Sequence, residues 1–131
     1  MNITVEPFLM FEGQAEAAMT FYAALLPNSR IVEIERYGAD APGPQGTIKT
    51  AVYELAGQRV RCADSPISHA FTFTPSLSLF LTVDAVEDVD VLAGQLGADG
   101  EAMMPADDYG FSRRFAWMQD RFGVSWQINC P

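Results

Sequence analysis

Short apolar runs recur along the chain in a fixed order, and the first set of runs reads as one structural unit. Residues 5–11 form an apolar, strand-like run, and after Gly13 the apolar positions of residues 14–26 return at the spacing of a helix face. Three more runs have the composition and length of strands. They cover residues 30–37, 47–56 and 58–64. This order predicts a βαβββ unit over residues 3–64, with a tight turn at Ala56-Gly57.

The same order returns in the second half of the chain. A strand-like run covers residues 76–83, Asp84 stands where a helix N-cap is expected, and the apolar positions from Val86 to Leu96 keep helical spacing. Further strands are expected over three segments, residues 101–104, 112–119 and 124–129, with a hairpin turn at 120–123. A shift of 72 residues also places Phe8 on Phe80. The chain is therefore predicted to be an α+β protein with a second unit over residues 76–130, joined to the first by residues 65–75.

Several motifs in these two units resemble one known superfamily. They are Pro7-Phe8-Leu9-Met10-Phe11-Glu12-Gly13, Phe21-Tyr22, Glu35-Arg36-Tyr37-Gly38, Asp64-Ser65-Pro66, the run from His69 to Pro75 and the run from Trp117 to Gln127. Together with the paired βαβββ plan, they resemble the PhnB-like branch of the vicinal oxygen chelate superfamily, which includes glyoxalase I and the bleomycin and fosfomycin resistance proteins. The resemblance implies a single domain over residues 1–131, in which two curved mixed sheets form a cup for a small molecule. It also implies a homodimer.

Proteins of this branch are often labelled 3-demethylubiquinone 3-methyltransferase-like, a label that implies a methyl donor. The chain has no Gly-x-Gly-x-x-Gly turn between a strand and a helix, and 131 residues leave no room for a separate nucleotide-binding domain. We therefore expect no cofactor, and the function has to be argued from the site.

The resemblance also implies where a metal would bind, because metal-dependent members take ligands from the opening and closing strands of each unit. In the closing strand of the second unit, the position that would carry a glutamate is Gln127, and its counterpart in the first unit is Arg61. The opening-strand histidines would fall at Glu6 or Pro7 and at Leu77 or Ser78. Imidazole and carboxylate are the ligands that such a site requires. Since none of these positions carries a histidine, we expect no built-in metal site.

The only histidine, His69, is the main candidate for acid–base chemistry. It could act with Asp64 or Cys62 as a catalytic group. The alternative is structural: Cys62 is a small buried residue in a strand, Asp64 caps the turn before Pro66, and His69 satisfies backbone groups. A rival hypothesis thus remains, in which the protein is an isomerase, lyase or transferase that uses His69 with Asp64, or a metal captured by Glu54 and Gln127.

Aromatic residues crowd into the late part of the second unit, with Arg113 and Arg114 among them. Phe115 and Arg113 point to one face of the predicted strand, and an aromatic wall with a guanidinium suits a flat or anionic molecule. Filling the core is the alternative role, which we expect for Trp126. The candidate ligand-binding residues are Tyr53, Arg61, Phe115, Trp117 and Gln127.

Composition narrows the possible partners. With 49% hydrophobic and 19% charged residues the chain is expected to fold as a globular domain, and its net charge of −9 argues against nucleic acid and anionic membrane surfaces. Two cysteines form no CxxC motif, and the N-terminus has no leader pattern, so a reduced, cytoplasmic setting is expected. We predict a metal-independent protein that binds a small organic ligand as a homodimer. A dimer whose cup is filled by its own side chains is the remaining alternative.

Overall fold

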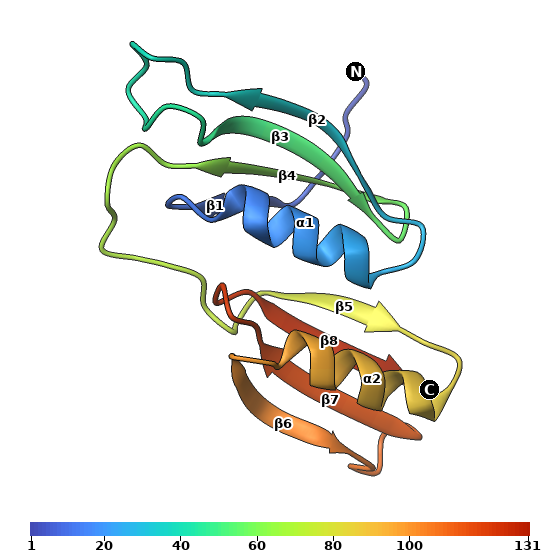
Figure 1. The fold of residues 1–131 in the computed structure, drawn as a ribbon. Helices are drawn as coiled ribbons and strands as arrows, with labels where there is room; N and C mark the ends of the chain where they lie inside the picture. The colour runs from blue at the N-terminus through green and yellow to red at the C-terminus, as the bar shows by residue number, and fades with distance from the viewer. The chain divides into compact units, whose positions relative to one another are not determined.

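Two helices and eight strands make up the chain in the computed structural model, which describes all residues from 1 to 131. The strands form two mixed four-stranded sheets, one in each of two units (Figure 1). Unit 1 covers Met1–His69 and unit 2 covers Ala70–Pro131, so the boundary lies within residues 65–75. The prediction of an α+β chain with two βαβββ units is confirmed.

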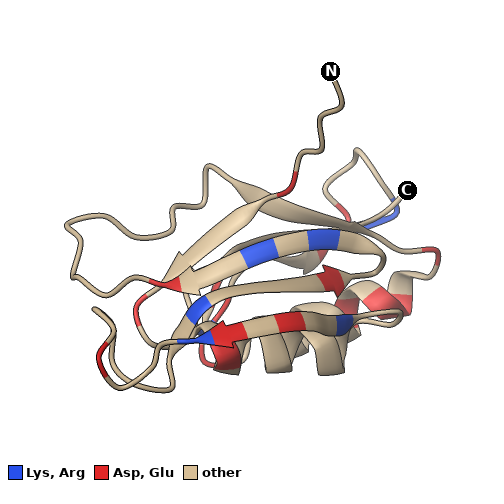
Figure 2. Cartoon of the chain, turned by 90° about the horizontal axis from the view of Figure 1, so that it is seen from above, with Lys and Arg blue, Asp and Glu red and all other residues tan.

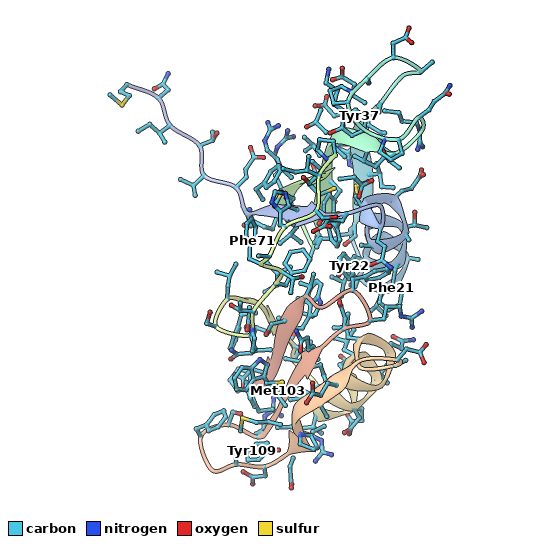
Figure 3. The ribbon with its side chains drawn as sticks, turned by 90° about the vertical axis from the view of Figure 1, so that its left-hand side faces the viewer. Phe21, Tyr22, Tyr37, Phe71, Met103 and Tyr109 are labelled. Carbon is cyan, nitrogen blue, oxygen red and sulfur yellow. The ribbon has the colours of Figure 1, made fainter.

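Unit 1 places its only helix on one face of its sheet. In chain order it contains β1 (Phe8–Phe11), α1 (Ala15–Leu25), β2 (Arg30–Arg36), β3 (Ile48–Leu55) and β4 (Gln58–Asp64). The strand order is β1-β4-β3-β2, with β1 parallel to β4 and the other pairs antiparallel. The buried side chains of α1 are those at helical spacing, including Met19 and Tyr22, the latter labelled in Figure 3. They pack on the apolar side of β3 and β4, which leaves a second, helix-free face.

Unit 2 repeats this plan. It contains β5 (Ser78–Thr82), α2 (Val86–Leu96), β6 (Glu101–Asp107), β7 (Arg114–Gln119) and β8 (Ser125–Cys130). The order β5-β8-β7-β6 again pairs the opening strand in parallel with the closing strand. Trp126 and Ile128 are fully buried on the side of α2, so the expected core position of Trp126 is confirmed.

The hairpin turns before the closing strands β4 and β8 contain residues with positive φ. Ala56 and Gly57 both have positive φ, 48° and 87°, which is the combination that a two-residue hairpin turn requires. In unit 2, Gly123 has φ 91° and donates its N–H to the carbonyl oxygen of Asp120 at 2.9 Å. Both predicted turns are therefore present.

Two local predictions were wrong. Asp84 is not the N-cap of α2: the cap is Ala85, and no side chain bonds to the helix terminus there. Strand β6 continues past Met104 through Pro105 to Asp107. Proline is tolerated because β6 is an edge strand, where a missing N–H costs no ladder hydrogen bond. Neither helix is long and apolar enough to cross a membrane.

Candidate functional site

The helix-free face of unit 2 gathers polar and aromatic side chains from three strands. In the register, Trp117 lies opposite Gln127, Ser125 opposite Ser78, and Phe80 opposite Gln127. Residues directly opposite each other project to the same face, as do residues two apart in one strand. The side chains on this face include those of Ser78, Phe80, Phe115, Trp117, Ser125, Gln127 and Asn129.

Four of these side chains form a continuous hydrogen-bond network. Trp117 donates through Nε1 to Ser125 Oγ at 2.8 Å, and Gln127 donates through Nε2 to Ser78 Oγ at 3.2 Å. The two serine hydroxyls bond to each other at 2.7 Å. Only one hydroxyl proton is needed for that bond, so the other remains available as a donor. The network fixes the edge of the Trp117 indole and one end of the Gln127 amide.

Asn129 extends this polar face next to the network. Its Oδ1 atom is buried and has no hydrogen-bond partner. A buried acceptor without a partner costs roughly 1 to 3 kcal/mol, so it offers a favourable position for an incoming N–H or O–H group.

An aromatic cluster borders the same face at the start of β7. Phe115 is opposite Asn129 in the register, and its ring meets those of Tyr109 and Phe111 edge to face, with centroids 6.3 and 5.0 Å away. Tyr109 and Phe111 belong to the loop between β6 and β7, where Figure 3 labels Tyr109. Phe115 itself is buried, and Phe111 is exposed. The face thus combines hydrogen-bonding groups with an apolar wall.

The helix-free face of unit 1 is charged instead. Arg61 lies opposite Phe8, and its Nε atom is 2.9 Å from Glu6 Oε2. Arg59, two residues earlier on β4, approaches the other oxygen of the same carboxylate at 3.7 Å. Figure 2 shows basic positions following one another along one strand of this sheet, with acidic positions on the strands beside it.

The two faces allow a test of whether the chain fits a metal ion. Arg61 is opposite Phe8 in unit 1 as Gln127 is opposite Phe80 in unit 2, so the two closing-strand positions are equivalent. In each unit this side chain contacts its partner on or beside the opening strand, Glu6 or Ser78. A guanidinium bound to a carboxylate and an amide bound to a hydroxyl do not make a divalent-metal ligand set. No group of three or more His, Cys, Asp or Glu side chains within either unit is arranged to hold a metal.

Asp64 is a structural carboxylate. Its Oδ1 accepts the N–H groups of Gly13 and Ala15 at 2.8 and 3.0 Å, and Oδ2 accepts that of Ile48 at 2.9 Å. The side chain therefore ties the start of α1 and the start of β3 to the end of β4. Its oxygens bond to three backbone groups, and a catalytic role for Asp64 with His69 stays a prediction. The suggested role as a cap of the turn before Pro66 differs from the bonds that it makes.

Cys62 and Tyr53 are both buried on the side of α1. Both have no exposed surface, and Cys62 shares its face with Asp64 and Val60. Burial, with a smaller contribution from the Asp64 charge, raises the pKa of Cys62 to about 12. The thiol stays protonated at neutral pH, which suits the predicted role of Cys62 as a small buried residue. A ligand-binding role for Tyr53 stays a prediction, but its side chain is on the opposite face from Arg61.

His69 pairs with a residue that the sequence analysis did not single out. Its Nε2 atom is 2.7 Å from Ser65 Oγ. The Ser65 N–H also donates to the carbonyl oxygen of Phe11 at 2.7 Å, which fixes the serine beside the end of β1. The i, i+4 spacing of Ser65 and His69 was visible in the sequence, but nothing there showed that the connecting segment turns back on itself.

The side chains of two other candidate residues, Glu54 and Arg113, are bonded to other groups of the protein. Glu54 is paired with Arg30 at 3.3 Å, within unit 1. The Arg113 guanidinium donates to the carbonyl oxygens of Pro131 and Asp84, so it holds the chain terminus and the segment before α2. Arg113 therefore does not extend the aromatic face. Arg59 and Asn129 were missed, although each lies two residues from a predicted site residue on the same strand.

Comparison with known proteins identifies the relatives of this chain. A family model described as 3-demethylubiquinone-9 3-methyltransferase matches residues 3–129. The chain belongs to this family. A protein from Bacillus cereus described as a putative 3-demethylubiquinone-9 3-methyltransferase, PhnB protein, is 44% identical, with a TM-score of 0.95 over 98% of this chain and 100% of that one.

More distant structures share the fold. A glyoxylase/bleomycin resistance protein/dioxygenase domain from Frankia is 16% identical, with a TM-score of 0.64 over 99% of this chain and 98% of that one. The fosfomycin resistance protein FosX from Listeria monocytogenes, solved with Mn(II), is 8% identical, with a TM-score of 0.64 over 100% and 93%. The chain therefore has the glyoxalase/bleomycin-resistance fold. No curated protein matches the chain.

The family description implies a methyl donor, and the first strand–helix turn is the place to test for one. In doubly wound folds a nucleotide cofactor binds where the first strand turns into the first helix. Here the N–H groups of Gly13 and Ala15 at that turn are taken by Asp64. Each sheet is also mixed rather than parallel. The residues at this turn do not fit such a cofactor.

Proposed function

We propose that this protein binds a small organic molecule at the helix-free face of unit 2, without a metal ion. The observation that carries the proposal is the Trp117–Ser125–Ser78–Gln127 network beside the buried, unpartnered Oδ1 atom of Asn129. Ligand sites typically combine an apolar wall with a few fixed polar groups. This face has both.

The polar atoms indicate the chemistry of the ligand. Asn129 Oδ1 accepts an N–H or O–H group, and the uncommitted serine proton donates to a carbonyl or hydroxyl oxygen. The exposed ring of Phe80 and the half-buried ring of Trp117 suit a flat ring or a short alkyl chain. A neutral ligand with one donor and one acceptor therefore matches this face.

Thermal-shift screening of a small-molecule library tests the proposal. A true ligand at one hundred times its dissociation constant stabilises the protein by about 2.7 kcal/mol, and the shift should persist in EDTA. Gln127→Leu should weaken binding at least tenfold, because it removes the donor to Ser78. Gln95→Leu, at an exposed position of α2, is the matched control and should bind normally. A library without stabilising compounds, or Gln127→Leu binding like the control, would contradict the proposal.

A second candidate function is acyl transfer by Ser65 and His69, which the 2.7 Å contact between Oγ and Nε2 favours. We propose that His69 takes the Ser65 proton while Oγ attacks the carbonyl carbon of a small ester. The alcohol leaves with that proton, and water, deprotonated by His69, then releases the acid and restores the serine.

Hydrolysis of p-nitrophenyl acetate distinguishes this second candidate. Ser65→Ala and His69→Gln should each lower the rate by about 100-fold or more, whereas Ser68→Ala, in the same segment, should not. Equal rates for the wild type and Ser65→Ala would exclude it. The ligand proposed for unit 2 is unaffected by either result.

A further inference from the structure

The aromatic cluster of Tyr109, Phe111 and Phe115 has two rings open to solvent above one buried ring. The planes of Tyr109 and Phe111 differ by 13°, with centroids 6.3 Å apart. Phe115 is nearly perpendicular to both, at 6.3 and 5.0 Å. Phe115 is buried, whereas Tyr109 is 40% and Phe111 63% exposed. The cluster therefore presents aromatic surface to molecules in solution.

The loop between β6 and β7 holds the two exposed rings in position. Gly110, which separates them, has a positive φ of 94°, a conformation that favours glycine. Its N–H donates to Asp108 Oδ1 at 2.8 Å, and the Asp108 N–H donates to Asp107 Oδ1 at 2.8 Å. The Tyr109 hydroxyl donates to the carbonyl oxygen of Pro105. Because these bonds order the loop in advance, a ligand loses little affinity to ordering it.

The charged groups around the cluster carry more negative than positive charge. Arg114 pairs with Asp90 of α2 at 2.7 Å, and Arg113 donates to the carbonyl oxygens of Pro131 and Asp84, so other segments hold both guanidiniums. The charged residues of this segment and of the groups bound to it are four carboxylates and two guanidiniums: Asp84, Asp90, Asp107, Asp108, Arg113 and Arg114. The whole chain has a net charge of −9. This electrostatic field favours a cation as ligand.

The ring geometry indicates which kind of cation fits. An aromatic face attracts a cation that lies within about 6 Å of the ring centroid. Since the three centroids are 5.0 to 6.3 Å from one another, one cation above the cluster can lie within that range of all three. Aromatic faces replace few of the hydrogen bonds that a primary ammonium makes with water, whereas a methylated ammonium has no such bonds to lose.

We propose that Tyr109, Phe111 and Phe115 bind the quaternary ammonium group of a small molecule. The inference goes beyond the proposed function, whose ligand is neutral and contacts the network that contains Trp117 and Gln127. The two sites adjoin each other at Phe115 and are tested with different probes.

Two probes of the same shape test the role of charge. Choline should shift the backbone amide NMR signals of Tyr109, Gly110 and Phe111, and the rings should move its N-methyl proton signal upfield. Dimethylbutanol, in which carbon replaces the choline nitrogen, should bind about fivefold more weakly or less, because it lacks the cation–π attraction. Equal binding of the two probes overturns the inference. Tighter binding of methylammonium than of tetramethylammonium overturns the assignment to a quaternary group.

Variants of the exposed rings then locate the site. Phe111→Leu and Tyr109→Leu should each lower choline affinity about fivefold, whereas Phe8→Leu, at a 54% exposed position of unit 1, should leave it unchanged. Phe111→Trp should raise the affinity, because the indole face binds cations best, and a purely structural role of Phe111 does not produce that gain.

The outcomes separate this inference from the proposed function. Unchanged choline affinity in Phe111→Leu and Tyr109→Leu overturns the inference. Choline shifts confined to Trp117, Gln127 and Asn129 overturn it as well, and leave the proposed function standing. Gln127→Leu should bind choline like the wild type, so a loss of the neutral ligand in that variant does not affect the cation site.

Discussion

Gln127 donates a hydrogen bond through Nε2 to Ser78 Oγ, 3.2 Å away across the parallel strands β5 and β8. The corresponding pair in unit 1 is Arg61 and Glu6, which form an ion pair at 2.9 Å. These are the positions where the superfamily resemblance would place metal ligands. Instead, an ion pair occupies these positions in unit 1 and a hydrogen bond between two neutral side chains occupies them in unit 2.

The first prediction concerns metal content. Protein purified without chelator and dialysed against Mn²⁺, Zn²⁺ or Ni²⁺ should retain well under one equivalent of metal, because Glu6 is bound to arginines and Gln127 offers only an amide. Elemental analysis provides the measurement. A tightly held equivalent of any of these metals would refute the prediction.

The second prediction concerns the contribution of Asp64 to stability. Asp64→Ala should lower the free energy of unfolding by about 3 kcal/mol or more, because three backbone N–H groups lose a buried carboxylate acceptor. Asp40→Ala, at an exposed loop position, should change it by less than about 0.5 kcal/mol. Urea denaturation compares the two. Similar stability of both variants would show that the three bonds contribute little.

The third prediction concerns thiol reactivity. With the pKa of Cys62 raised to about 12 by burial, its thiolate fraction at pH 8 is about 1,000-fold lower than that of an ordinary cysteine. Native protein should therefore react very slowly with iodoacetamide at this position, and denatured protein quickly. Mass spectrometry measures both rates. Full labelling of native Cys62 within minutes would contradict the shift.

The raised pKa of Cys62 also makes the free energy of unfolding depend on pH. The folded state holds the Cys62 proton to a higher pH than the unfolded state does, so this contribution is complete below pH 9.0 and is lost as the pH rises towards 12.

Much of the fold was predictable because local chemistry and tertiary structure agree. The helical spacing of Ala15, Ala18, Met19 and Tyr22 is the buried face of α1, and Gly57 and Gly123 have the positive φ that their turns require. Predictions failed where neighbouring strands decide the outcome. Pro105 looks like a strand terminator, but β6 lies at a sheet edge.

Less of the candidate site could be predicted. Strand alternation correctly predicted that Phe115 and Arg114 project to opposite faces of the sheet, since Arg114 pairs with Asp90 of α2. It could not show that Asp64 binds the distant amides of Gly13, Ala15 and Ile48, because those bonds depend on how the chain packs. For the same reason His69 was matched with Asp64 or Cys62 rather than with Ser65.

The fourth prediction uses Trp117 as an optical probe. A ligand on the helix-free face of unit 2 should change the fluorescence of the wild type, whose tryptophans are Trp117 and Trp126. In Trp117→Phe the remaining Trp126 is fully buried and bonded to Asp120, so the same ligand should leave the emission unchanged. An undiminished response in this variant would place the ligand elsewhere.

The fifth prediction is that two copies associate. Opening strands β1 and β5 are sheet edges, and Phe8, Leu77 and Phe80 leave large apolar surfaces exposed on or beside them. Such surfaces favour association. Light scattering at micromolar concentration should give twice the chain mass of 14.4 kDa. A mass of one chain would rule out a stable dimer.

Asp64 and Asp120 each protect backbone N–H groups of one unit from solvent. Asp64 accepts hydrogen bonds from the amides of residues 13, 15 and 48, and Asp120 accepts them from groups of residues 122, 124 and 126. Loss of one set of bonds leaves the backbone N–H groups of that unit without their carboxylate acceptor. The amides of residues 13, 15 and 48 in unit 1 and of residues 122 and 124 in unit 2 should therefore be protected from hydrogen exchange.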